Sequence, residues 1–297
     1  MIGAFVLGFT DNLVFTFSSD IGLWQFQALR GVACLIMIAL QTWLMGGSMM
    51  PKRWRPVLLR CGLLSIAILL FFGALPLTGV AMAGAGMFTA PIFVLIYSVI
   101  LFREQIGLYR ILAVAIGSAG VILILDLGGS AFSFYALMAI GAGAFYGANH
   151  IVTRRHCADE SPAALLFVYI IMITIVGIIM ASLMSMVSLP ADISADAYYL
   201  LRGWSPFSWM QLLMLMLNAL GTVIALQFMA WGYQRAETSY VAIYEYSYLL
   251  FGGLFGWLLW GDILGVKSLF GIVCIVLAGA VITLRNRAAA QSADATA

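Results

Sequence analysis

Ten long apolar runs, separated by short polar gaps, limit what this 297-residue chain can fold into. A helix needs roughly 20 mostly apolar residues to cross the hydrocarbon core of a bilayer, and each run is close to that length. The chain is 64% hydrophobic and only 9% charged, whereas a soluble domain is about 25% charged. We therefore expect an all-α integral membrane protein with ten transmembrane helices. The predicted helices cover residues 2–18, 23–44, 57–75, 79–101, 109–127, 133–153, 163–187, 208–230, 238–260 and 266–284.

The basic residues predict how these helices are oriented. Lys and Arg concentrate in the cytoplasmic loops of membrane proteins. With the N-terminus in the cytoplasm, 11 basic residues fall on that side and only Arg202 and Lys267 on the other. We therefore expect a protein of the cytoplasmic (inner) membrane with both termini in the cytoplasm. The residues on the expected cytoplasmic side are Lys52, Arg53, Arg55, Arg60, Arg103, Arg110, Arg154, Arg155, Arg235, Arg285 and Arg287.

The connections that contain Lys and Arg also predict two halves of opposite orientation. In the first half these connections follow the second and fourth apolar runs, whereas in the second half they follow the first, third and fifth. Residues 101–125 also resemble residues 259–284, and Glu104 aligns with Asp262 at an offset of 158. Two unrelated apolar helices could share this likeness, but inverted repeats are typical of secondary transporters, which bind solute between the halves. The expected units are a first repeat over 1–128, a second repeat over 131–285 and a cytoplasmic tail over 286–297.

Three charged side chains lie well inside apolar runs: Asp11, Arg30 and Glu245. A charge near the middle of a lipid-spanning helix costs at least ~2.5–3.5 kcal/mol, so such a residue is a candidate for function. Asp11 and Arg30 lie about 10 and 12 Å from the same end of two consecutive helices, which allows an ion pair. Two interpretations remain open. The pair either fixes the two helices to each other or faces a central cavity and binds a charged group of a substrate.

Glu245 lies in the ninth predicted helix, about 10 Å from the expected cytoplasmic surface. The last five runs contain no basic residue at that depth, so we expect the carboxyl to lack a basic partner. It is therefore either permanently protonated and hydrogen-bonded to a neighbouring helix, or a candidate for proton coupling.

Polar and aromatic residues near the glutamate are further candidates for substrate binding. Tyr246 and Tyr248 follow it in the same helix, and Tyr97 lies near the inner end of the fourth helix. Aromatic rings suit a planar or cationic solute, although tyrosines also form interfacial belts. Asn149 can donate hydrogen bonds across helices. Its neighbour His150, near the cytoplasmic end of the sixth helix, is either an interfacial residue, which we favour, or part of a relay.

Two segments resemble the drug/metabolite transporter superfamily, EamA type. They are TAPIFVLIYSVILFREQIG (89–107) and YEYSYLLFGGLFGWLLWGDILG (244–265), and each is similar to a family helix that ends in an acidic turn. The resemblance covers nearly the whole chain. It implies a ten-helix transporter of a small organic solute and leaves the solute and the direction open.

One branch of that family, which includes riboflavin and S-adenosylmethionine uptake proteins, is similar at several charged positions. These are the Glu245-Tyr246 pair followed by Asp262, together with Asp11 and Arg30. The branch often has a lysine a few residues after the first-helix aspartate, whereas NLVFTF follows Asp11 in this chain.

The sequence therefore predicts a secondary transporter. The solute is an amino-acid derivative or a vitamin- or nucleoside-like compound, with export and proton coupling as options. Uptake of a riboflavin- or S-adenosylmethionine-like compound is the alternative, followed by a channel or a membrane scaffold. No ATP-binding motif is present, so the energy must come from a gradient or from exchange.

Other classes of function lack the residues that they need. The two histidines lie at one loop edge, and there is no Gly-rich phosphate loop, so we expect no catalytic residues and no enzyme. The four cysteines show no CxxC or Cys/His ligand spacing, which predicts no metal site and no cofactor. The basic residues form short clusters at helix ends, so nucleic acid is not an expected partner. The expected partners are the solute and the lipid bilayer, and the sequence predicts no particular oligomeric state.

Overall fold

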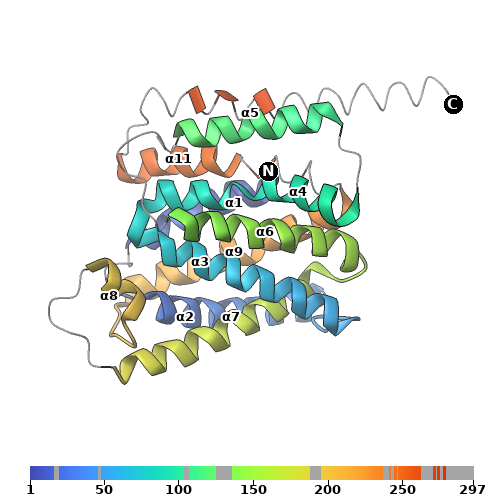
Figure 1. The fold of residues 1–297 in the computed structure, drawn as a ribbon. Coiled ribbons are helices and arrows are strands. Elements are labelled where there is room, and N and C mark those ends of the chain that lie inside the picture. Colours follow the sequence, from blue (N-terminus) through green and yellow to red (C-terminus); the bar gives the residue numbers. More distant parts are fainter. Residues whose placement is uncertain are drawn as a thin grey trace.

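The computed structural model describes most of the chain, and every regular element in that part is a helix. The helices lie side by side with roughly aligned axes (Figure 1). The described residues are 1–16, 20–45, 48–103, 107–124, 136–187, 195–236, 241, 244–245, 247–261, 270–271, 273–274 and 277–278. The α-helices are α1 Ile2–Asn12, α2 Leu23–Met45, α3 Trp54–Met87, α4 Ala90–Phe102, α5 Leu108–Ile124, α6 Ala136–His156, α7 Pro162–Ser185, α8 Ala195–Leu201, α9 Trp209–Arg235 and α11 Ser247–Trp260, and a 3-10 helix, η1, covers Leu13–Thr16.

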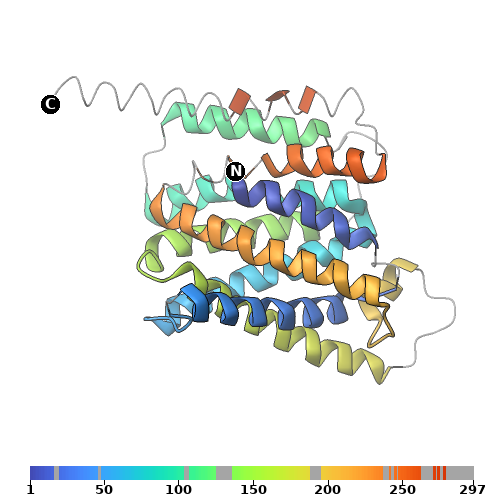
Figure 2. The same ribbon diagram turned by 180° about the vertical axis from the view of Figure 1, so that it is seen from behind.

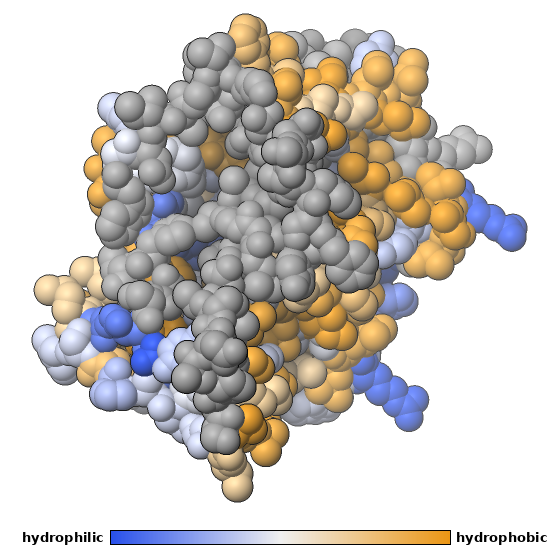
Figure 3. All heavy atoms as spheres, turned by 60° about the vertical axis from the view of Figure 1, so that its left-hand side comes forward, coloured by the Kyte–Doolittle hydropathy of each residue, from blue (hydrophilic) through white to orange (hydrophobic). Residues whose placement is uncertain are grey.

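The described helices have the length and surface of membrane spans. Four segments are long and apolar enough to cross a bilayer: Leu23–Leu44, Trp54–Ala74, Pro162–Ser185 and Trp209–Arg235. Shorter apolar helices accompany them. Apolar side chains cover much of the described surface, with several strongly hydrophilic ones projecting at its edges (Figure 3). The expectation of a helical integral membrane protein is confirmed, while ten spans and inverted repeats stay predictions.

The third and fourth predicted helices meet differently from the expectation. The helical backbone continues from Trp54 to Met87 and is interrupted only at Phe88 and Thr89, not between residues 75 and 79. Within this run Gly73 lies against Met138 of α6 and Gly86 against Ala139. In a straight helix these two glycines would be about 20 Å apart. The α3 run must therefore bend back on itself, and its two arms pack on the same stretch of α6.

The first helix lies between two helices of the second half of the chain, α9 and α11 (Figure 2). Small residues let the backbones approach closely. A Cβ on Gly8 would lie 2.8 Å from the backbone nitrogen of Gly252, and Gly221 of α9 faces Thr10. This close packing places Asp11, one residue after Thr10, at the contact between the N-terminal helix and the second half.

Candidate functional site

A cavity of about 80 Å³ lies among helices from both halves of the chain. That volume holds a few water molecules. Its lining includes all three intramembrane charges that the sequence singled out, so the fold brings Asp11, Arg30 and Glu245 to one place. The remaining lining residues are mostly apolar and aromatic: Ala4, Leu7, Ile68, Phe71, Phe72, Met87, Phe88, Tyr146, Tyr169, Thr222, Leu226, Met229 and Tyr248.

Asp11 is held by a tyrosine of the second half. The hydroxyl of Tyr248 donates a hydrogen bond to Oδ2 of Asp11 over 2.9 Å. Asn218 of α9 donates to the backbone carbonyl of Thr10 over 2.9 Å, which ties α9 to the same turn of α1. Tyr248 thus occupies the cavity wall beside a carboxylate.

Arg30 is not paired with Asp11. Its Nη2 donates a hydrogen bond to Oε1 of Gln27. The guanidinium carbon also lies 4.8 Å from the ring centroid of Phe26 and 5.4 Å from that of Phe72. No described carboxylate lies within ion-pair distance of this buried cation. The expected ion pair is therefore wrong. Asp11 is directed to Tyr248, and Arg30 lies against aromatic faces.

Glu245 has a basic neighbour that the sequence analysis did not expect. Its Oε2 lies 3.5 Å from Nε2 of His150, and its Oε1 accepts a hydrogen bond from the hydroxyl of Tyr146 over 3.3 Å. Both Glu245 and His150 are buried. His150 faces the interior and not the membrane interface, because α6 turns the face that carries Tyr146 and His150 toward Glu245 and α9.

The imidazole of His150 is enclosed by aromatic rings. It stacks on Tyr233 with 3.7 Å between centroids and 11° between planes, and it meets Tyr146 edge-on at 4.1 Å. Its Nδ1 lies 3.4 Å from Nδ2 of Asn149. A second cavity, of about 10 Å³, is lined by His150, Asn149 and Tyr233 and shares Tyr146 with the first. Polar groups therefore continue beyond the first cavity along α6.

Arg60 lines this second cavity and is a residue that the sequence analysis missed. It is only 5% exposed, and its guanidinium donates to Thr153 Oγ1 over 3.2 Å and to the carbonyl of Leu165 over 3.3 Å. Arg60 belongs to the basic residues expected on the cytoplasmic side. Its position three residues inside the predicted span 57–75 was the available signal.

The remaining predicted site residues have different positions. Asn149 is buried at the second cavity. Tyr97 lines neither cavity; its hydroxyl donates to the carbonyl of Ala144 over 3.3 Å at the contact between α4 and α6. Tyr246 lies outside the described residues.

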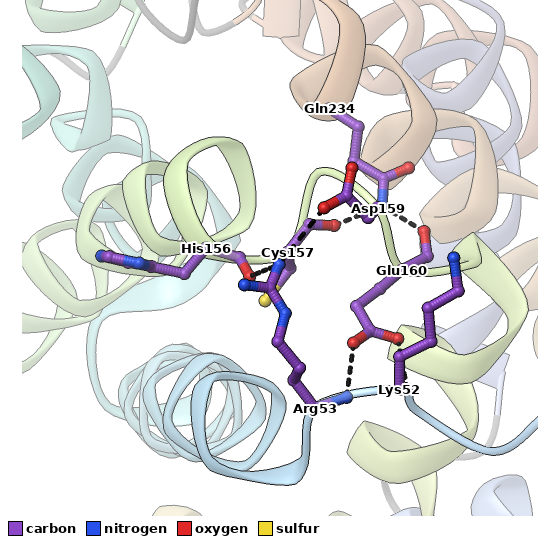
Figure 4. A network of polar contacts seen from close by, with 7 residues as sticks. All are labelled: Lys52, Arg53, His156, Cys157, Asp159, Glu160 and Gln234. Carbon is purple, nitrogen blue, oxygen red and sulfur yellow. Dashed lines mark hydrogen bonds and ion pairs between the residues drawn. The ribbon is translucent and has the colours of Figure 1, made fainter.

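Beyond the second cavity, a polar network joins the connections at one end of the bundle (Figure 4). The carboxylate of Glu160 accepts hydrogen bonds from the backbone N–H groups of Lys52 and Arg53, both over 2.8 Å. The side chain of Gln234 donates to the carbonyls of Cys157 and Glu160 over 2.8 and 2.6 Å. We call this set the basic-end network; it comprises Lys52, Arg53, His156, Cys157, Asp159, Glu160 and Gln234.

A family assignment follows from comparison with known proteins. The sequence pattern of the EamA-like transporter family matches residues 1–126 and 133–284. The chain belongs to the EamA-like transporter family. It is therefore a member of the drug/metabolite transporter superfamily, and the predicted resemblance is confirmed. The names of the family and of its relatives favour membrane transport of a small solute over enzymatic catalysis.

Similar proteins are also transporters by name. This EamA-like transporter is 25% identical over 198 residues to a riboflavin transporter of Vibrio cholerae serotype O1, covering 66% of the chain and 60% of that relative. It is 27% identical over 222 residues to an uncharacterized transporter of Helicobacter pylori strain J99, covering 74% and 70%. A solved crystal structure of another protein shares the fold, with a TM-score of 0.73 at 19% identity over 96% of both chains.

Proposed function

We propose that this EamA-like transporter is a secondary transporter that moves a small organic metabolite across the cytoplasmic membrane through the central cavity. In this proposal ten spans form two inverted five-helix repeats, over 1–128 and 131–285, and both termini are cytoplasmic. The two matched segments of the family pattern and the distribution of basic residues support this arrangement.

The observation that carries the proposal is the origin of the cavity's charged groups. Asp11 and Arg30 come from the first half of the chain, and Glu245 and Tyr248 come from the second. A site at the contact between halves can open alternately to each side when the halves rock against each other. Among the described residues Arg30 has no carboxylate partner, so an anionic group of the solute can supply one.

The cavity chemistry suits a solute with both charged and aromatic parts. Arg30 would bind a carboxylate or phosphate, for which the planar guanidinium fork is suited. Asp11 with Tyr248, and Glu245, would bind amine or hydroxyl groups, while Phe71 and the other rings of the wall pack on a planar moiety. We infer export of an amino-acid derivative or of a vitamin- or nucleoside-like compound. In this proposal Glu245 carries the coupled proton.

Uptake of a riboflavin-like compound is the second candidate. The named Vibrio cholerae relative and the aromatic wall of the cavity favour it. An S-adenosylmethionine-like solute fits the same combination of a planar ring with charged groups. Riboflavin lacks an amine and a carboxylate, so its binding would depend less on Arg30 than that of an amino-acid derivative.

The test is a thermal-shift screen of the purified protein against metabolite pools, followed by flux into proteoliposomes for each compound that stabilises it. We expect saturable flux for at least one compound, and its loss in Arg30→Ala with the protein still monodisperse. Arg202→Ala is the matched control, because Arg202 is a partly buried cation that does not line the cavity. Full flux in Arg30→Ala would refute the binding role of this cavity.

A further inference from the structure

A surface groove of about 420 Å³ lies between α2 and α9, with the first residue of α7 in its wall. The helices α2 and α9 lie side by side on the face shown in Figure 2. Thr222 and Leu226 of α9 line the larger cavity. Ile224, Gln227 and Trp231 are spaced by three and four residues on another face of α9 and line the groove. The groove is therefore a separate site that shares one helix with the cavity.

The groove has about the length of one lipid leaflet. Along α9 its lining runs from Leu220 to Trp231, about 16 Å of helix. That is half of a hydrocarbon core roughly 30 Å thick. Beyond the last lining residue, the guanidinium carbon of Arg235 lies 4.6 Å from the ring centroid of Trp231. Because tryptophan is enriched at the level of the lipid headgroups, this end of the groove matches the membrane surface at the basic end.

The wall of the groove is apolar although two glutamines contribute to it. Nε2 of Gln41 donates to Oε1 of Gln227 over 3.1 Å, and Nε2 of Gln227 donates to Oε1 of Gln41 over 2.7 Å. An amide without a partner is costly in hydrocarbon, and the reciprocal pair offsets that cost. Leu220, Ile224 and Phe228 are between 38 and 48% exposed and add apolar surface. The groove can therefore hold an acyl chain.

The basic end of the groove has an excess of positive charge. Arg235 is exposed there, and among the described residues it forms no ion pair with a carboxylate. Lys52 is also exposed, and its backbone N–H binds Glu160, two residues before α7 begins. The carboxylate of Glu160 is occupied by backbone N–H groups, and that of Asp159 pairs with Arg53. An anionic group at this end would therefore be attracted by two cations.

We propose that this groove binds one anionic phospholipid from the leaflet at the basic end, with an acyl chain between α2 and α9 and the phosphate at Arg235. Lys52 adds to the attraction for an anionic headgroup. A second copy of the chain is a poorer occupant, because a two-fold interface would bring the same cations of both copies together. Since α2 belongs to the first half of the chain and α9 to the second, the bound lipid stabilises the contact between them.

Lipid binding to the delipidated protein in detergent, measured by native mass spectrometry, tests the headgroup site. We expect one dioleoyl phosphatidylglycerol to bind at least about fivefold more tightly than dioleoyl phosphatidylcholine, which has the same chains. Arg235→Gln should reduce this preference about fivefold. Arg155→Gln is the matched control and should keep it, because Arg155 is an exposed cation on α6, outside the groove. An unchanged preference in Arg235→Gln would overturn the headgroup site.

Filling the groove tests where the acyl chain lies. Ile224→Trp should weaken the binding of both lipids about tenfold, the loss of roughly two methylene contacts. Leu213→Trp is the control, because Leu213 is 46% exposed on α9 and does not line the groove. Equal lipid affinities of these two variants would overturn the proposal, as would a lipid-independent dimer that is lost only in Ile224→Trp. Both measurements are made without flux, so their outcome is separate from the proposed transport function.

Discussion

The basic-end network and the central cavity both contain buried polar groups, but their polar atoms are satisfied to different degrees. At the basic end, both oxygens of Glu160 accept backbone N–H groups and Gln234 donates to two carbonyls. Around the cavities, Gln27 Nε2, Asn149 Oδ1 and Asn218 Oδ1 have no hydrogen-bond partner among the described protein groups. Native structures rarely leave such atoms unsatisfied without a reason. We therefore expect the network to serve stability, and the unsatisfied atoms support the proposal that the cavity region binds a solute.

The largest effect is expected where the polar groups are fully satisfied. Glu160→Ala leaves the N–H groups of Lys52 and Arg53 without their acceptor at the start of α3. A buried donor left without an acceptor costs about 1–3 kcal/mol, and these two donors are only partly buried, so the variant should lose about 2–4 kcal/mol of stability, read as a lower Tm in detergent. Asp159→Ala is the control, because that carboxylate is exposed and its 3.4 Å pair with Arg53 contributes little. Equal Tm values for the two variants would contradict the role given to Glu160.

A milder change should loosen the network without unfolding the protein. Burial raises the pKa of the Cys157 thiol to about 11, so little reactive thiolate is present at neutral pH. In a chain whose other cysteines are replaced by alanine, Glu160→Gln should speed maleimide labelling of Cys157 about tenfold, because local opening becomes less costly. Labelling by both chains should rise with pH. Unchanged labelling in Glu160→Gln would show that the network does not close this end.

In the cavity we expect the opposite pattern, with function lost and stability kept. Arg30→Lys keeps the charge and the helix but removes the planar fork that rests on Phe26 and Phe72. Flux of a carboxylate-bearing solute should fall about tenfold with little change in Tm. The comparison is with Arg202→Lys, whose flux should be normal. A large drop in the Tm of Arg30→Lys would mean that Arg30 is mainly structural.

The contrast also explains what the sequence could predict. Apolar length predicted a helical membrane protein, and the cost of a buried charge identified all three charged residues that line the larger cavity. Depth along a helix does not give rotation about its axis, which is why the Asp11–Arg30 ion pair was wrong. The chain bends back between Gly73 and Gly86, an interval that includes the gap predicted after residue 75, but the helical backbone continues through that gap, which apolar length alone does not predict.

His150 was missed although a signal existed. Tyr146, His150 and Thr153 stand at i, i+4 and i+7 in α6, which places them on one face of the helix. A polar and aromatic stripe on a transmembrane helix predicts an interior face. The distance of His150 from the helix end does not reveal this pattern, so it did not predict the contact between His150 and Glu245.

The smallest expected effect is the difference between removing a tyrosine hydroxyl that lies in the cavity and removing one that lies outside it. Tyr248→Phe removes the hydrogen bond to Asp11 but keeps the ring, and Tyr97→Phe removes the bond to the Ala144 carbonyl away from both cavities. A neutral donor to a charged acceptor contributes about 1.5–3 kcal/mol, part of which the cavity can replace with water. We therefore expect the KM for the transported solute to rise a few-fold in Tyr248→Phe and to stay unchanged in Tyr97→Phe, measured as initial flux against solute concentration. Equal effects of the two variants would mean that the Asp11–Tyr248 contact is packing between α1 and α11, and that the solute meets the cavity mainly through Arg30 and Glu245.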